Sequence, residues 1–241
     1  MRCRKYNMIF KSKQEEIVAE NPVLDPVHII SFAGIERADL PFFLAKILEQ
    51  RNTIEGFRNV LLIDNSDSKN LFRIVDNDSD EVTLNRMTFM KNIGYDEKLF
   101  ERYSFVIFYH GFDIDTEILN KSDLVVMSTD YDPNTNRILV GLMSGYTGEI
   151  QMVYRDWATK KIKENLIEEM LEIDSSQVEM RSIIKLNMDD ASAYIALLYN
   201  GNQRLNMSGL SELFMETLKY LTEKITGADE KTIKSLIRKA R

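Results

Sequence analysis

Three charged residues near the start of the chain stand where a folded protein often presents backbone N–H groups to an anion. Glu36, Arg37 and Asp39 follow an apolar run at residues 27–32 and precede a helix-like segment at residues 40–51. A helix N-terminus after a strand favours anions, because its unpaired N–H groups and the helix dipole point toward the ligand. Glu36 and Asp39 would repel a phosphate there and give the helix its own negative charge. We interpret the turn as part of a nucleotide-binding fold that has lost its catalysis.

Apolar runs alternate with helix-like segments along the chain. The runs lie at residues 27–32, 60–63, 105–109, 124–128, 150–154 and 183–186. They are short and uninterrupted, which is typical of strands covered on both faces. The main helix-like segments lie at residues 40–51, 160–172 and 191–199, each long enough for a crossover between parallel strands. The pattern predicts an α/β fold with a doubly wound, mostly parallel sheet and helices on both faces.

Composition limits the classes of protein that the chain can belong to. It has 241 residues, 44% of them hydrophobic, and a formal net charge of -7, which argues against a nucleic acid partner because such partners are held by Lys and Arg. The single cysteine, Cys3, excludes an internal disulfide framework and a Cys-rich metal site. No apolar run approaches the roughly 20 residues that cross a bilayer. We therefore expect a cytoplasmic protein.

The order and spacing of these segments resemble the ParA/MinD family of deviant phosphate-loop ATPases over residues 27–227. That family has a helix often containing Leu-Ala-Lys after its phosphate loop, and this chain has the same tripeptide at residues 44–46. Counting back from it places Gly34 on a loop glycine, Glu36 on a later glycine and Arg37 on the phosphate-binding lysine. Asp39 then replaces a threonine. The resemblance implies that the metal-binding hydroxyl and the signature cation are missing.

Two further positions depart from the family's pattern. Asp64 follows the second apolar run and matches the first carboxylate of the family's Asp-x-Asp strand end, whose second carboxylate is absent here. Tyr109 stands where the family's next strand ends in an aspartate directed toward Mg²⁺. Phosphoryl transfer depends on positioning and charge neutralisation, so these losses together predict no ATPase activity and no cofactor. Gly34, Glu36, Arg37, Asp39 and Asp64 would be the remnant of the nucleotide loop.

The resemblance therefore implies a catalytically inactive ParA/MinD-like protein. It would act as a scaffold, localisation or regulatory partner of a bacterial assembly such as a pilus, secretion, conjugation or division apparatus. Its partners would be other proteins, and a homodimer is allowed in which Glu36 and Asp39 meet basic residues of a neighbour. The alternative is an ATPase switch of the partition or septum-site type that binds ATP and Mg²⁺ through Arg37, Asp64 and a non-standard loop. A weaker alternative is a small-molecule enzyme that uses His110 and Asp113.

The ends of the chain are set apart from the expected domain at residues 27–227. Residues 1–26 form an N-terminal extension, and residues 228–241 form a basic amphipathic tail. The tail places its apolar residues at helical spacing and interleaves cations with them: Ile233, Leu236, Ile237, Lys234, Arg238 and Lys239. One interpretation is contact with a partner or an anionic membrane surface, which would make the protein peripherally membrane-bound. The other is a terminal helix that covers an edge of the core.

Overall fold

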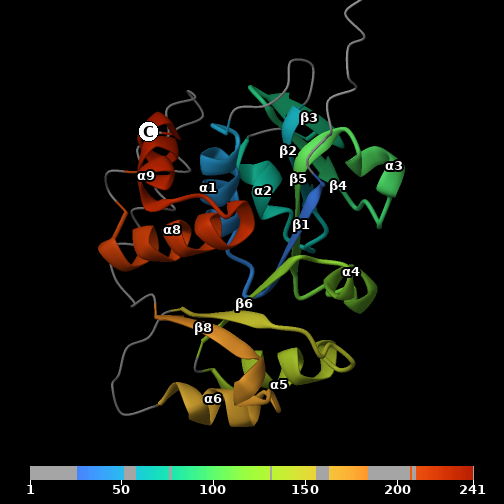
Figure 1. Cartoon of the computed structure of the whole chain (residues 1–241). Helices are drawn as coiled ribbons and strands as arrows, with labels where there is room; N and C mark the ends of the chain where they lie inside the picture. Colours follow the sequence, from blue (N-terminus) through green and yellow to red (C-terminus); the bar gives the residue numbers. More distant parts are fainter. Residues whose placement is uncertain are drawn as a thin grey trace, which may run out of the picture.

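The computed structural model describes residues 26–51, 58–75, 78–130, 132–155, 163–183, 207 and 210–240. These residues build one eight-stranded sheet in the order β3-β4-β2-β5-β1-β6-β7-β8 (Figure 1). The strands are β1 (His28–Gly34), β2 (Arg58–Asp64), β3 (Glu81–Leu84), β4 (Met87–Lys91), β5 (Tyr103–Gly111), β6 (Leu124–Thr129), β7 (Ile150–Tyr154) and β8 (Val178–Ile183). All neighbouring strands are parallel except β3 and β4. The predicted α/β class is confirmed.

Helices cover both faces of this sheet (Figure 1). One face carries α1 (Asp39–Leu48), α2 (Asn70–Ile74), α8 (Glu212–Thr226) and α9 (Glu230–Ala240). The other carries α3 (Glu97–Phe100), α4 (Thr116–Asn120), α5 (Pro133–Leu142) and α6 (Glu164–Met170), the last of which leads through the 3-10 helix η1 (Ser175–Gln177) into β8. Because both faces are covered, the central strands are apolar without alternation. Among the described residues, no helix combines the length and the apolarity that crossing a membrane requires.

Two parts of the sheet differ from the sequence-based prediction. The β3–β4 hairpin was not predicted. The last described strand is β8, at residues 178–183, and of the predicted strand at residues 183–186 only residue 183 is described. Both segments lie toward the edges of the sheet, where partly exposed strands mix polar and apolar residues and lose the uninterrupted signal. The predicted helix at residues 191–199 lies outside the described residues.

The C-terminal helix α9 belongs to the core. Its residues Ile233, Leu236 and Ile237 are buried in the same cluster as α1 and α8, and Figure 1 shows the three helices together on one face. This corrects the expectation that these three side chains contact a membrane or a partner. The apolar stripe of α9 is covered by its own fold, as the alternative interpretation predicted.

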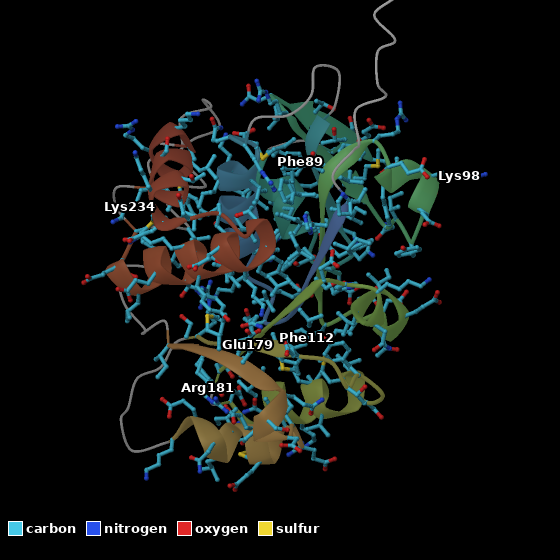
Figure 2. The ribbon with its side chains drawn as sticks, in the orientation of Figure 1. Phe89, Lys98, Phe112, Glu179, Arg181 and Lys234 are labelled. Atoms are coloured by element: carbon cyan, nitrogen blue, oxygen red, sulfur yellow. The ribbon has the colours of Figure 1, made fainter. Side chains whose placement is uncertain are left out.

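The outer face of α9 is cationic. Lys234, Arg238 and Lys239 are exposed, and Lys234 points away from the helix toward solvent (Figure 2). Lys234 also forms an ion pair with Glu230 one turn earlier, at 2.5 Å. Contact with an anionic membrane stays a prediction, and these cations are the groups of α9 that could make it.

Replacing Ile237 with alanine should test the packing of α9. We expect Ile237→Ala to lower the free energy of unfolding by about 2–5 kcal/mol, because it removes a buried side chain and leaves a cavity. Urea denaturation followed by circular dichroism measures this change. Lys234→Ala on the exposed face of the same helix is the matched control, with an expected change of about 0.5 kcal/mol or less. Equal effects of the two substitutions would mean that α9 does not pack as described.

Candidate functional site

The candidate site lies at the carboxyl ends of the central parallel strands. Phe32 of β1 is in register with Tyr109 of β5, which is in register with Asp64 of β2. The loop between β1 and α1, residues 35–38, crosses this edge of the sheet. Ligands of open α/β sheets bind at such an edge. The structure therefore brings the predicted remnant loop together with Asp64 and Tyr109.

Gly34 lets the β1–α1 loop close against β6. Its φ is +101°, and a Cβ at this position would lie 2.0 Å from the carbonyl oxygen of Ser128, so only glycine fits. The N–H of Ile35 donates to that same carbonyl at 2.9 Å, and the N–H of Arg37 donates to the carbonyl of Ile35 at 2.7 Å. A phosphate-binding loop turns such N–H groups toward its ligand. In this loop the N–H groups of Ile35 and Arg37 are instead hydrogen-bonded to carbonyls of the chain itself.

Asp39, the first residue of α1, is paired within the chain. Nη2 of Arg155, the residue that follows β7, donates to both carboxylate oxygens of Asp39. Both side chains are buried, with 6% of Asp39 and 1% of Arg155 exposed. The Arg155 guanidinium also lies 5.8 Å from the centre of the Phe214 ring on α8. Asp39 therefore does not line an open acidic pocket, and its basic partner comes from its own chain and not from a neighbouring copy.

The sequence did not single out Arg155. Its only signal was the position of a charged residue directly after an apolar run, where side chains of open α/β folds gather around a site. Nothing in the sequence links it to Asp39, 116 residues away.

Asp64 is committed to the turn that follows β2. Its Oδ1 accepts hydrogen bonds from the N–H of Ser66 at 3.1 Å and from the Ser66 hydroxyl at 2.6 Å, and its Oδ2 accepts from the N–H of Leu71 at 2.9 Å. Burial raises the pKa of Asp64, against the hydrogen bonds and the charge of Lys69, which act to lower it. The resemblance matches Asp64 with a catalytic carboxylate of the family. In this structure its hydrogen bonds stabilise the turn that leads into α2.

Glu36 and Tyr109 complete the site. A Cβ at Gly111 would lie 2.8 Å from Cγ of Glu36, so the Glu36 side chain folds over the end of β5. The backbone carbonyl of Glu36 accepts a hydrogen bond from the Asn70 side chain at 2.9 Å. The pKa of Tyr109 is strongly raised, because the phenol is buried and the charges of Asp64 and Glu36 disfavour a second anion. Tyr109 is therefore neutral at physiological pH.

The polar side chains around the β1–α1 loop bear on whether it could hold Mg-ATP. Within the described part of the chain, no group of three or more His, Cys, Asp or Glu side chains is arranged to hold a metal ion. Of the two loop carboxylates, Asp39 is paired with Arg155 and Glu36 covers the end of β5. No hydroxyl residue occupies positions 36–39, where the family supplies a metal ligand.

His110 lies on the opposite face of β5 and is closed to substrate. It is fully buried, its Nε2 lies 3.3 Å from Oγ of Ser31, and that oxygen lies 2.8 Å from Oγ of Ser122. Burial lowers the pKa of His110 to about 4. The imidazole is therefore neutral and structural. This argues against the alternative hypothesis of a small-molecule enzyme that uses His110 and Asp113.

The Asp39–Arg155 pair should be strongly coupled in stability. We expect Arg155→Met to cost about 3–5 kcal/mol, because it leaves the Asp39 carboxylate buried without its cation. Adding Asp39→Asn should recover part of this cost, giving a coupling energy of about 1–3 kcal/mol in a double-mutant cycle measured by urea denaturation. Arg137→Met on the exposed surface of α5 is the control, with an expected change within about 0.5 kcal/mol. Additive effects of the two site substitutions would contradict the pairing.

His110 should make the protein less stable in acid. Its pKa is lowered in the folded state, so its contribution is complete above the ordinary value of about 6.5 and disappears as the pH falls toward 4. Up to about 3 kcal/mol of unfolding free energy should be lost across this range. Urea denaturation at a series of pH values measures the loss, which should be absent from His110→Asn and present in His28→Asn. The same acid loss in all three proteins would rule out His110 as its source.

Comparison with known proteins agrees with this architecture. No sequence-family profile and no curated protein matches the chain. A chain of the MinC:MinD cell division protein complex of Aquifex aeolicus aligns with a TM-score of 0.56 at 11% identity, over 84% of this chain and 97% of that one. The ParA family ATPase from Chlorobium tepidum TLS aligns at 0.46 and 15% identity, over 87% and 98%. The septum site-determining protein MinD from Pyrococcus horikoshii OT3, complexed with Mg-ADP, aligns at 0.45 and 12% identity, over 89% and 95%. The first of these alignments shows that this chain shares the α/β fold of that chain of the MinC:MinD complex.

Proposed function

We propose that this chain is a ParA/MinD-like protein that neither binds nor hydrolyses ATP and acts through contacts with other proteins. Its role would be that of a scaffold, localisation or regulatory partner in a bacterial assembly. The observation that carries this proposal is the closure of the β1–α1 loop on its own chain. The N–H of Ile35 is bonded to Ser128, and Asp39 is bonded to Arg155.

Each part of this closure opposes phosphate binding for a separate reason. An N–H that already donates to a carbonyl cannot donate to a phosphate without breaking that bond. Arg155 is the cation nearest to Asp39, and its charge is neutralised in a buried pair that is costly to separate. Glu36 adds a negative charge at the loop, and the pKa of Tyr109 already reflects the combined charge of Glu36 and Asp64. A triphosphate would therefore meet repulsion and few donors.

A role in protein contact agrees with the surface. Within the described residues, large apolar side chains are exposed on several helices: Ile138 of α5, Leu166 and Met170 of α6, and Leu213 of α8. Leu166 and Met170 lie one turn apart on α6, and neighbouring exposed apolar side chains are a feature of interaction sites in soluble proteins. Self-association and contact with an anionic membrane through α9 stay predictions.

Calorimetric titration of the full chain with Mg-ATP tests the proposal. We expect no heat of binding and no phosphate release with millimolar Mg-ATP. We also expect no shift of Tm, because a ligand at about 100 times its Kd would stabilise the folded state by about 2.7 kcal/mol. A ParA-type ATPase measured in parallel shows that the assay detects binding.

The alternative nucleotide switch makes the opposite prediction. It requires Mg²⁺-dependent binding, dimerisation that light scattering detects only with nucleotide, and loss of both in Arg37→Ala. That set of results would overturn the proposal. Heat of binding that Arg37→Ala leaves unchanged would also overturn it, since ATP would then bind somewhere other than the predicted remnant loop.

A further inference from the structure

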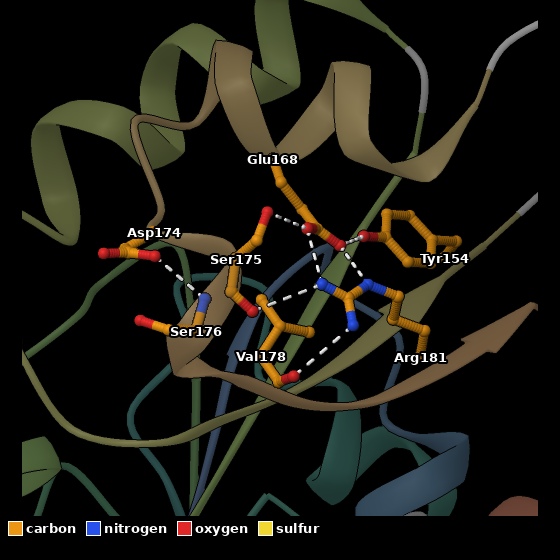
Figure 3. A network of polar contacts seen from close by, with 7 residues as sticks. All are labelled: Tyr154, Glu168, Asp174, Ser175, Ser176, Val178 and Arg181. Atoms are coloured by element: carbon orange, nitrogen blue, oxygen red, sulfur yellow. Dashed lines mark hydrogen bonds and ion pairs between the residues drawn. The ribbon is translucent and has the colours of Figure 1, made fainter.

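A buried tyrosine lies beside a glutamate at two places along the sheet. At the first, the Tyr154 hydroxyl at the end of β7 donates to the Glu168 carboxylate of α6 at 2.6 Å. Nε of Arg181 on β8 donates to the same carboxylate at 2.6 Å, and the Ser175 hydroxyl donates to it at 3.1 Å (Figure 3). Glu168 is fully buried, and the charge of Arg181 balances its own. This carboxylate therefore has both its hydrogen-bond donors and its cation within the chain.

The second place is the candidate site, where Tyr109 of β5 lies beside Glu36. Tyr109 is 2% exposed, and its hydroxyl has no hydrogen-bond partner among the described residues. Such a hydroxyl is rare in a folded protein, because it has given up its contacts with water without gaining others. The Asn70 side chain donates to the Glu36 carbonyl at 2.9 Å and acts to lower the pKa of Tyr109, whereas the charge of Glu36 acts to raise it. The phenol oxygen therefore lies in the same site as Glu36.

The Glu36 carboxylate has no cation of its own. Its side chain packs against Gly111, where a Cβ would lie 2.9 Å from Oε1 of Glu36. Within the described part of the chain, however, this carboxylate makes neither a hydrogen bond nor an ion pair. The second tyrosine and glutamate thus lack the kind of group that Arg181 supplies to the first.

The cations around the candidate site are engaged elsewhere. Arg155 donates to both carboxylate oxygens of Asp39. Nζ of Lys69 donates to Oδ1 of Asn92 at 2.6 Å. Arg37 follows Glu36 in the chain and has its contacts with other groups. The charge of Glu36 is therefore left for a group from outside the chain.

The donor set at this site fits an ammonium group better than a metal ion. Hard divalent cations take six or more oxygen ligands, and both oxygens of the neighbouring Asp64 already accept hydrogen bonds. An alkylammonium group has three N–H donors on one atom and a single charge, so it can bind a carboxylate and a phenol oxygen that come from different elements. A guanidinium is a planar fork that suits one carboxylate bound at two points.

The site can be reached from outside the molecule. Glu36 is half-buried and belongs to the loop that crosses the carboxyl edge of the sheet. Because its side chain folds over the end of β5, an ammonium group at its carboxylate comes within reach of Tyr109 on the same strand. A charge pair that forms beside a buried ring is partly shielded from water, which strengthens it.

We propose that Glu36 and Tyr109 form a binding site for the ammonium group of a lysine side chain that a partner protein presents. One N–H of the ammonium donates to the Glu36 carboxylate, and another donates to the hydroxyl oxygen of Tyr109. The inference rests on the proposed function in one respect, namely that the lysine belongs to another protein. It names the chemistry by which the β1–α1 loop recognises that partner.

Titration of the full-length protein with the peptide acetyl-Ala-Lys-Ala-amide tests the site. Glycine-specific ¹⁵N labelling gives amide signals for Gly34 and Gly111 at the site and for Gly145, which follows α5 toward the opposite edge of the sheet. We expect saturable shifts at Gly111 while Gly145 stays unchanged. The same peptide acetylated at Nζ has no charge and should cause no shift. Shifts with both peptides, or with neither, would overturn the proposal.

Two variants assign the contacts. Glu36→Gln should weaken binding of the lysine peptide about tenfold or more, because it removes the charge and keeps the size of the side chain. Tyr109→Phe should weaken binding about two- to tenfold and raise Tm by about 2–4 °C, because it removes a buried hydroxyl that has no partner. Glu97→Gln, at an exposed carboxylate of α3, is the control and should leave the affinity unchanged. Unchanged affinity in Glu36→Gln or in Tyr109→Phe would overturn the assigned contacts.

Two further titrations separate the possible sources of failure. The peptide should bind about two- to tenfold more tightly than n-butylammonium, because its backbone adds hydrogen bonds with the loop. Equal or tighter binding of n-butylammonium would assign the site to free amines and overturn the role of a partner's lysine. Mg-ATP that shifts Gly34 and Gly111 would overturn the proposed function itself. Absence of peptide binding together with absence of Mg-ATP binding would overturn only the lysine site.

Discussion

The buried ion pair between Asp39 and Arg155 is the constraint on which the candidate site depends. Asp39 begins α1, and Arg155 follows β7, two strands away from β1 in the sheet. Two desolvated charges are costly to separate once each is the other's partner. The pair therefore fixes the start of α1 beside the end of β7, and the loop before it closes against β6 through Ile35 and Ser128. The negative charge at the start of α1 is thus neutralised from within the chain.

The other residues at this edge of the sheet also serve the fold. Asp64 supplies both carboxylate oxygens to its own turn, and Tyr109 places a neutral phenol between carboxylates. The fold can keep its shape without phosphoryl chemistry because the buried apolar layers on either side of the sheet hold it together. Because the fold does not depend on the site, the α/β fold is compatible with the proposed absence of ATPase activity.

The two helical layers differ in how completely they are covered. On the face of α1, the helix α9 buries its apolar stripe and presents cations to solvent, whereas α8 buries most of its apolar residues and leaves Leu213 exposed. On the other face, α6 keeps Leu166 and Met170 exposed. Because a buried network already fixes α6, a partner that bound its exposed apolar side chains would lose less free energy to ordering this helix.

Periodicity along the chain was sufficient to predict the fold class, because buried parallel strands must be apolar on both faces and their crossovers must be helical. It predicted the central strands and α1 near their observed limits. It missed the β3–β4 hairpin and most of β8, whose residues mix polar and apolar types at the sheet edges. The sequence also predicted the apolar stripe of α9. It could not decide whether this stripe contacts a membrane or the protein core, since both are apolar.

Residue types identified Glu36 and Asp39 as charges at a strand-end site, because a turn between strand and helix collects backbone donors, and the family resemblance added Asp64. Only the tertiary structure decided what those charges do. Asp39 meets Arg155 across 116 residues of chain, and Asp64 turns its oxygens inward to Ser66 and Leu71. The physical reason is that a local pattern determines which face of an element is apolar, whereas the partner of a buried charge depends on which distant element the sheet order places beside it.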